Sequence, residues 1–169
     1  SYAQIKFLNK NYGMAVTTVG NSVVTFNGGV NWAACTAFAA AQNNISVEVP
    51  QDNMAVVGNN LGGFHITYDA GTTWEAIAWD LTGAGSIVNI KRAPENDHCL
   101  WMLHNTAGPV GTIWRSWNGG STWDQMNVIT NNGLYGLDVI NSETAYVAGY
   151  IVGAGTAAII KYTEKYPPV

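Results

Sequence analysis

The side chains in this sequence that could do chemistry are carboxylates, histidines, hydroxyls and thiols, and their spacing decides which chemistry is open to them. Glycoside hydrolysis, for example, needs two carboxyl groups held on either side of one bond. No two acids are singled out by their spacing, and we expect most of them to solvate turns. Outside the repeated motif described below, the acids are Glu48, Asp52, Glu75, Asp80, Glu95, Asp97, Asp124, Asp138, Glu143 and Glu164.

The histidines and cysteines form no catalytic or metal-binding pattern. A serine triad needs its serine on a strained turn, and the sequence has no Gly-x-Ser-x-Gly. We therefore expect His65, His98 and His104 to be non-catalytic. Cys35 and Cys99 stand apart without a Cys-x-x-Cys or Cys/His cluster, which argues against zinc and favours two unpaired thiols. Phosphate-loop and dinucleotide motifs are also missing, so we predict no metal and no cofactor.

The composition excludes several classes of function. Only 11% of the 169 residues are charged, and the net charge is -4, so no strong positive field attracts nucleic acid. No apolar run reaches the roughly 18 residues needed to cross a membrane, so we expect no membrane insertion. Gly, Asn and Thr take the place of charge, a profile common in secreted and virion-surface β proteins. We therefore favour an extracellular or virion-associated setting.

Asp69 differs from the other acids because it belongs to a motif that occurs three times. The motif reads Ser/Thr–aromatic–Asp/Asn–x–Gly–x–Thr/Asn–Trp, and Asn replaces the acid in two copies. An amide does not ionise, so a catalytic acid could not be exchanged in this way. Asp and Asn both accept hydrogen bonds from backbone amides of their own turn, and Gly allows a conformation that other residues resist. We therefore predict three structural turns, built by Thr25, Asn27, Gly29 and Trp32; by Thr67, Asp69, Gly71, Thr73 and Trp74; and by Ser116, Asn118, Gly120, Thr122 and Trp123.

The strands that must position these turns recur with the same period. Upstream of each motif lie an alternating segment, a nearly all-apolar segment and a short segment that runs into the motif, while a fourth segment starts near the tryptophan. A fourth copy of this pattern ends at Tyr162 without the turn motif. Four-stranded units of roughly 40–50 residues are typical of propeller blades. We predict one domain, residues 1–169, with repeats at about 1–43, 44–85, 86–132 and 133–169.

Two segments leave the prediction open. The alanines of Ala34–Gln42 favour a helix, although this segment falls where the first repeat should finish its outer strand. The last repeat has lost its turn motif, and Pro167 and Pro168 cannot donate ladder hydrogen bonds. Either the last blade stays three-stranded with a blunted edge, or a neighbouring chain supplies what is missing through self-assembly or a larger complex.

The repeated motif resembles the Asp-box of the BNR-repeat propellers, a group that includes sialidases, sortilin-type receptors and photosystem II assembly factor propellers. The resemblance extends over the whole chain through the strand pattern as well as the boxes. It implies an all-β propeller of about four blades, with each box as the turn between the third and fourth strands of a blade. A sialidase site resembles a cluster of three arginines, and only Arg92 and Arg115 are present. This departure argues against sialidase activity.

The predicted function is therefore a non-catalytic propeller that presents loops to a protein partner. In the resembled topology, the fourth-to-first and second-to-third strand connections share one side of the disc, and loops on a rigid scaffold are the usual carriers of binding. A carbohydrate-binding or glycosidase-like module remains the alternative, and a fragment of a larger receptor-type propeller is a third interpretation. The candidate binding face consists of Trp79, Asp80, His104, Asn105 and Tyr150.

Overall fold

The computed structural model describes residues 2–38, 43–78, 85–106, 108, 110–130, 132–151 and 156–163. Within these ranges every regular element is a β-strand, and no helix is long and apolar enough to cross a membrane. Several strands, such as Ser22–Thr25, are rich in Val, Ile or Thr, because β-branched side chains suit a pleated surface. Gly, Asn and Asp recur in the turns that connect the strands.

The strands form four antiparallel sheets, each built from neighbours in the sequence. The first sheet contains β1 (Tyr2–Phe7), β2 (Gly13–Thr17), β3 (Ser22–Thr25) and β4 (Ala33–Ala34). The second contains β5 (Asn44–Glu48), β6 (Ala55–Asn59), β7 (Phe64–Thr67) and β8 (Glu75–Ala76). The third contains β9 (Gly85–Ala93), β10 (Asn96–Thr106), β11 (Val110–Ser116) and β12 (Asp124–Thr130). The fourth contains β13 (Asn132–Asn141), β14 (Thr144–Ile151) and β15 (Thr156–Thr163).

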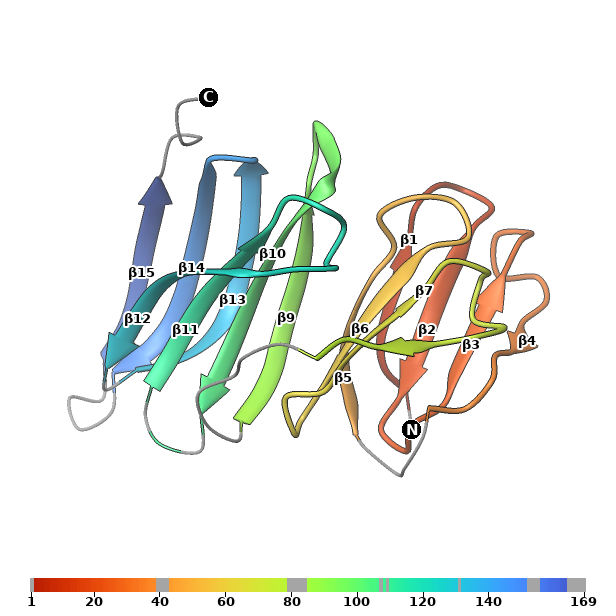
Figure 1. Ribbon diagram of the computed structural model, residues 1–169, viewed down its shortest axis with the longest axis horizontal. Coiled ribbons are helices and arrows are strands. Elements are labelled where there is room, and N and C mark those ends of the chain that lie inside the picture. Colours follow the sequence, from red (N-terminus) through yellow and green to blue (C-terminus); the bar gives the residue numbers. More distant parts are fainter. Residues whose placement is uncertain are drawn as a thin grey trace.

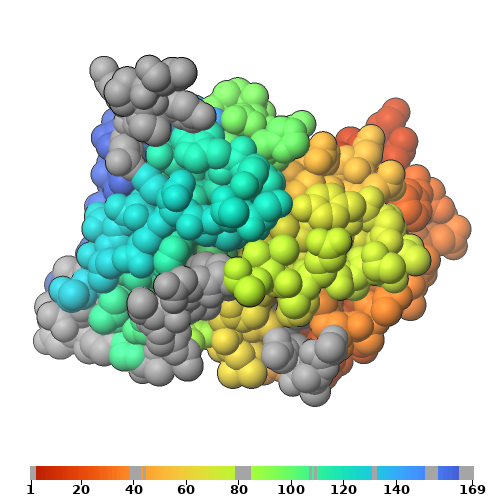
Figure 2. Space-filling view, viewed as in Figure 1, coloured from red at the N-terminus to blue at the C-terminus, as the bar shows by residue number. Residues whose placement is uncertain are grey.

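The sheets follow one another through space in chain order. Their innermost strands β1, β5, β9 and β13 are neighbours in that order, and each sheet continues outward from its inner strand. Figure 1 shows the first and fourth sheets at opposite ends of the long axis, and the colours of Figure 2 run in the same order across the molecular surface. The expected all-β propeller architecture of four antiparallel units is therefore confirmed.

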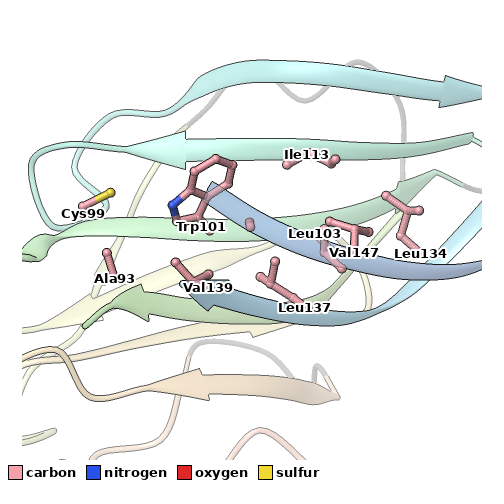
Figure 3. Packing of buried hydrophobic residues seen from close by; sticks show 10 residues of the cluster. Ala93, Cys99, Trp101, Leu103, Ile113, Leu134, Leu137, Val139 and Val147 are labelled. Carbon is pink, nitrogen blue, oxygen red and sulfur yellow. The ribbon is translucent and has the colours of Figure 1, made fainter. Parts of the chain in front are cut away.

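Three hydrophobic clusters hold the four sheets together, one at each junction. Met14 and Val16 of the first sheet pack with Val47 and Val57 of the second. The next junction is built the same way, from Val56, Phe64 and Ile66 against Ile87, Ile90, Leu100 and Met102. The last joins β10 and β11 to β13 and β14 (Figure 3), through Trp101, Leu103, Ile113, Leu134, Leu137, Val139 and Val147. Burying both faces of an inner sheet in this way removes apolar surface that a single sheet would expose.

The structure describes part of each of the two segments for which the sequence left the prediction open. Ala33–Ala34 form β4, and residues 35–38 continue without helical structure, while residues 39–42 lie outside the described residues. The fourth sheet has three strands in the part of the chain that the structure describes, and the prolines at 167 and 168 lie outside it.

Candidate functional site

The three repeated motifs form three turns that share three hydrogen bonds. In each turn the first hydroxyl accepts a hydrogen bond from the glycine N–H, from Gly29 to Thr25 at 2.9 Å, from Gly71 to Thr67 at 2.8 Å and from Gly120 to Ser116 at 2.8 Å. The same hydroxyl donates to the side-chain oxygen of Asn27, Asp69 or Asn118. That oxygen accepts from the backbone N–H four residues later, at Asn31, Thr73 or Thr122. Each eight-residue motif is thus closed on itself.

The glycines are required by the backbone of these turns. Gly29, Gly71 and Gly120 have φ values of 88°, 86° and 95°, a region that favours glycine. The residue before each of them donates its N–H to a backbone carbonyl of the same sheet. Gly28 and Ala70 donate to Asn11 and Asn53 in the turn between the first two strands, and Gly119 donates to His98 near the start of β10. Each motif is therefore fastened to its own sheet at a second point.

The motif tryptophans extend these turns into the packing between sheets. Trp74 lies against Phe38 of the preceding unit with ring centroids 4.4 Å apart, and Trp123 lies against Phe64 at 5.2 Å. Trp32 has a different environment, because it contacts Phe7 of its own sheet and stays partly exposed. The contrast between Trp32 and the other two tryptophans marks the first sheet as open on one side.

Three of the described acids, Asp69, Glu48 and Glu95, have partners within the fold. Asp69 accepts hydrogen bonds from the side chain and backbone of Thr73, and these bonds hold the pKa of Asp69 below its usual value. Glu48 is buried beside Lys6, with Oε2 and Nζ 3.0 Å apart, and Glu95 accepts from Ser142. No group of three or more His, Cys, Asp or Glu side chains among the described residues could hold a metal ion.

The two arginines lie apart and are engaged separately. Arg92 forms an ion pair with Asp97. Arg115 is buried at the junction of the third and fourth sheets, where its guanidinium lies 4.5 Å from the ring centroid of Trp117 and donates to the Ser142 carbonyl. A buried guanidinium that packs on an aromatic ring contributes to the core and is not placed to bind the carboxylate of a soluble substrate.

A pocket of about 410 Å³ lies beside the connection between β6 and β7, the start of β9 and the end of β10. We call it the loop-side pocket. Leu61 and Tyr135 are strongly exposed at its rim, and the amides and hydroxyls around them carry no charge. Ser86 donates to the Asn60 carbonyl at 3.0 Å and so ties the second sheet to the third across the pocket. The lining residues are Asn60, Leu61, Gly85, Ser86, Val88, Asn105, Thr106 and Tyr135.

The structure separates the residues that we expected to form one binding face. His104 is only 1% exposed, and its Nδ1 lies 3.3 Å from the Thr112 hydroxyl. The expectation that His104 contacts a partner is therefore wrong, because β10 continues past this position and turns the imidazole into the packing. Burial also lowers the pKa of His104, which favours the neutral form of the ring. Trp79 and Asp80 lie outside the described residues.

Asn105 and Tyr150 have different environments. The Asn105 side chain lines the loop-side pocket, but its amide donates to the Leu134 carbonyl at 2.7 Å and accepts from the Leu134 N–H at 2.9 Å. Asn105 therefore links the third sheet to the fourth, and its amide is already used within the fold. Tyr150 is exposed near the end of β14 and does not line the loop-side pocket.

Sequence reasoning missed the residues that join one sheet to the next. Gln4 accepts a hydrogen bond from the Val47 N–H, and Ser46 accepts one from the Ile90 N–H at 2.9 Å. Gln4 and Ser46 occupy the same register position of their inner strands. A polar residue repeated at this position was the feature of the sequence that could have identified them. The pocket residues Asn60, Leu61 and Tyr135 were also missed, because they come from different repeats and only packing brings them together.

The radial succession of antiparallel sheets, with turns of one type between the third and fourth strands, defines this chain as a β-propeller. Comparison with solved structures agrees. The chain superposes on "YCF48 bound to D1 peptide" with a TM-score of 0.68 and 21% identity, covering 97% of this chain and 55% of that one. It superposes on YCF48 from Cyanidioschyzon merolae with a TM-score of 0.68 and 17% identity, covering 96% and 51%.

The chain thus spans about half the length of the two solved structures. No family model and no curated protein matches the sequence. At these identities the similarity establishes the fold.

Proposed function

We propose that this chain is a non-catalytic propeller module that binds a segment of another protein in the loop-side pocket. The observation that carries the proposal is the chemistry of that pocket, where apolar Leu61, Val88 and Tyr135 alternate with uncharged hydrogen-bonding groups. Its volume of about 410 Å³ suits a few side chains of a bound segment. The backbone of an extended peptide offers the donors and acceptors that amides and hydroxyls recognise.

Two further observations support this proposal. The structure described as YCF48 bound to D1 peptide shows that a chain with the same fold can carry a peptide ligand. Within the described residues, the acids are engaged in turns, ion pairs or hydrogen bonds or stand separately, which supports a binding role over an enzymatic one.

We also propose that the three turns are structural Asp-boxes of the BNR type. Their three shared hydrogen bonds support this role, because Asn27 and Asn118 accept the same backbone hydrogen bond as Asp69 without a carboxylate. The low charge and the abundance of uncharged polar side chains support an extracellular or virion-associated setting. These proposals describe a rigid scaffold whose turns hold the sheets while its opposite side carries the ligand.

A carbohydrate is the second candidate ligand. The exposed ring of Tyr135, in the same pocket as the Asn60 amide, is an arrangement on which a sugar ring could stack and hydrogen-bond. The same pocket serves both candidates, so one set of variants separates them.

Selection from a displayed library of random peptides, together with a glycan array and a glycosidase panel, tests the proposal. We expect the selected peptides to lose at least tenfold in affinity with Leu61→Asp and with Tyr135→Ala. A Val128→Ser variant is the matched control, because Val128 is exposed on β12 away from the pocket and its loss should leave affinity unchanged.

Glycan signals that depend on Tyr135, without peptide binding, would replace the first candidate by the second. Peptide binding that survives both pocket variants would show that the site lies elsewhere. Turnover of any glycoside would contradict the non-catalytic role.

A further inference from the structure

The register of the four sheets identifies equivalent positions, and one of these positions differs sharply at the start of the chain. Val47, Ile90 and Leu137 oppose Val57, Met102 and Val147 on the next strand and pack on the preceding sheet. The exposed fractions of Val47 and Ile90 are 1% each. Ile5 occupies the same position, opposite Ala15, but is 55% exposed. An interface position is therefore present in the first sheet without its interface.

The neighbours of Ile5 form an apolar surface that we call the leading face, defined by Ile5, Phe7, Ala15, Val23 and Trp32. A hollow of about 470 Å³ lies on it and is lined by Ala3, Gln4, Ile5, Ala15, Val23 and Trp32. Trp32 completes the pattern, since the equivalent Trp74 and Trp123 lie against the rings of Phe38 and Phe64 in the preceding units. The leading face has the chemistry of an internal junction.

The fourth sheet has a matching exposed surface on the face that points away from the third sheet. Phe64 and Ile113, which oppose Gly58 and Leu103, are 1% and 0% exposed. Ile159 opposes Ala148 at the same register position and is 79% exposed. Tyr146, equivalent to the buried Val56 and Trp101, is also exposed. We call this surface the trailing face, defined by Tyr146, Ala148, Ile159 and Lys161.

One position on the inner strands carries a charged residue in every sheet. Lys6, Glu48, Lys91 and Asp138 oppose Met14, Val56, Trp101 and Tyr146 on the second strands, so all four hold one register position. Their signs alternate from sheet to sheet, and Lys6 pairs with Glu48 across the first junction at 3.0 Å. A further unit that began again with lysine would continue this alternation after Asp138.

We propose that two copies of this chain close one ring, with the trailing face of each copy packed on the leading face of the other. Four sheets from each of two copies make eight blades, within the range of roughly 4–8 found in propellers. A head-to-tail contact of this kind forms a closed ring when its rotation closes and a filament when it does not.

The internal junctions specify the contacts of this interface. A Cβ placed on Gly58 would overlap the Ile87 side chain and lie 3.3 Å from Ile90 Cδ1, so the equivalent Ala148 faces the stretch of β1 that includes Ile5 in the second copy. Phe64 packs on Trp123 with ring centroids 5.2 Å apart, so the equivalent Ile159 packs on Trp32 of the second copy. Asp138 lies beside Lys6 of the second copy, as Glu48 lies beside Lys6 within one chain. Each copy contributes one leading and one trailing face, so both interfaces are the same.

The mass of the chain in solution is the first test. Sedimentation velocity and light scattering at ~50 μM should give twice the 18.1 kDa of one chain. Ile5→Glu on the leading face and Ile159→Glu on the trailing face should each reduce the assembly to monomers, because either change places a carboxylate in both interfaces. Val128→Glu, on the exposed side of β12, is the matched control and should stay dimeric. Circular dichroism checks that each variant remains folded.

A cross-link tests the geometry independently of stability. The double variant Ile5→Cys/Ala148→Cys should form a disulfide-linked dimer under mild oxidation, while Val19→Cys/Ala148→Cys should not, because Val19 lies in the exposed β2–β3 connection. Wild type controls for the native Cys35 and Cys99.

A monomeric wild type would overturn the proposal. The same holds if both faces are covered by further blades of a longer chain, because that chain would also be a monomer. A dimer that neither glutamate variant disrupts would place the interface elsewhere. Growing filaments would show that the head-to-tail contact exists but does not close.

Discussion

Replacing Thr67 by valine isolates the hydroxyl that closes the second turn. Thr67 is almost fully buried, and its Oγ1 donates to Asp69 Oδ1 at 2.8 Å and accepts from the Gly71 N–H at 2.8 Å. Valine has nearly the same shape, so it leaves no cavity. The buried Gly71 N–H loses its acceptor, which costs about 1–3 kcal/mol in the free energy of unfolding. For a domain of this size the melting temperature should fall by roughly 2–12 °C.

Thermal and urea melts of Thr67→Val measure this loss. Thr67→Ser is the matched control, because it keeps the hydroxyl and copies the third turn, where Ser116 makes the same bonds. We expect the serine variant to retain most of the stability. If valine changed the free energy of unfolding by less than ~0.5 kcal/mol, the size of an ordinary surface substitution, the hydroxyl would not hold the turn.

Other substitutions separate packing, charge and pH. Trp74→Ala should lose roughly 3–5 kcal/mol of stability because a large ring leaves the Phe38 contact, whereas Asp69→Asn should lose little, and equal thermal shifts would give the carboxylate a role of its own. Burial lowers the pKa of His104 in the folded chain. Below pH 6.5 the unfolded chain therefore binds more protons than the folded chain, and the free energy of unfolding should decrease as the pH is lowered. Melts at pH 7.5 and 5.5 should show a smaller acid loss for His104→Gln than for the exposed control His98→Gln.

The fold could be predicted from the sequence because its information is local. Each turn motif contains the hydroxyl, the Asp or Asn side chain and the glycine that close it, and every strand pairs with its neighbour in the chain. Short-range patterns of this kind repeat visibly, so the number and order of sheets follow from them. The pairing of Thr67 with Asp69 illustrates this, because both partners lie within three residues.

The binding surface could not be predicted in the same way, because it is assembled across repeats. Leu61 and Tyr135 line one pocket although they belong to the second and fourth sheets. His104 was expected in a loop, but β10 extends to Thr106 and pairs His104 with Thr112, which buries the ring. The residue at which a strand ends depends on how far the neighbouring strand pairs with it, and the local sequence does not contain that information.

The chain-order packing of the sheets makes the stability of one chain a nearest-neighbour problem. Each junction joins only adjacent sheets, through its own hydrophobic cluster and a side-chain bond such as that from the Val47 N–H to Gln4. The energy is then a sum of terms for single sheets and for the junctions between them, as in repeat proteins. The second and third sheets have two junctions each, and the outer sheets have one. In the monomeric Ile5→Glu variant, amide hydrogens of β6 and β10 should therefore exchange more slowly than those of β2 and β14, and opening should progress inward from both ends.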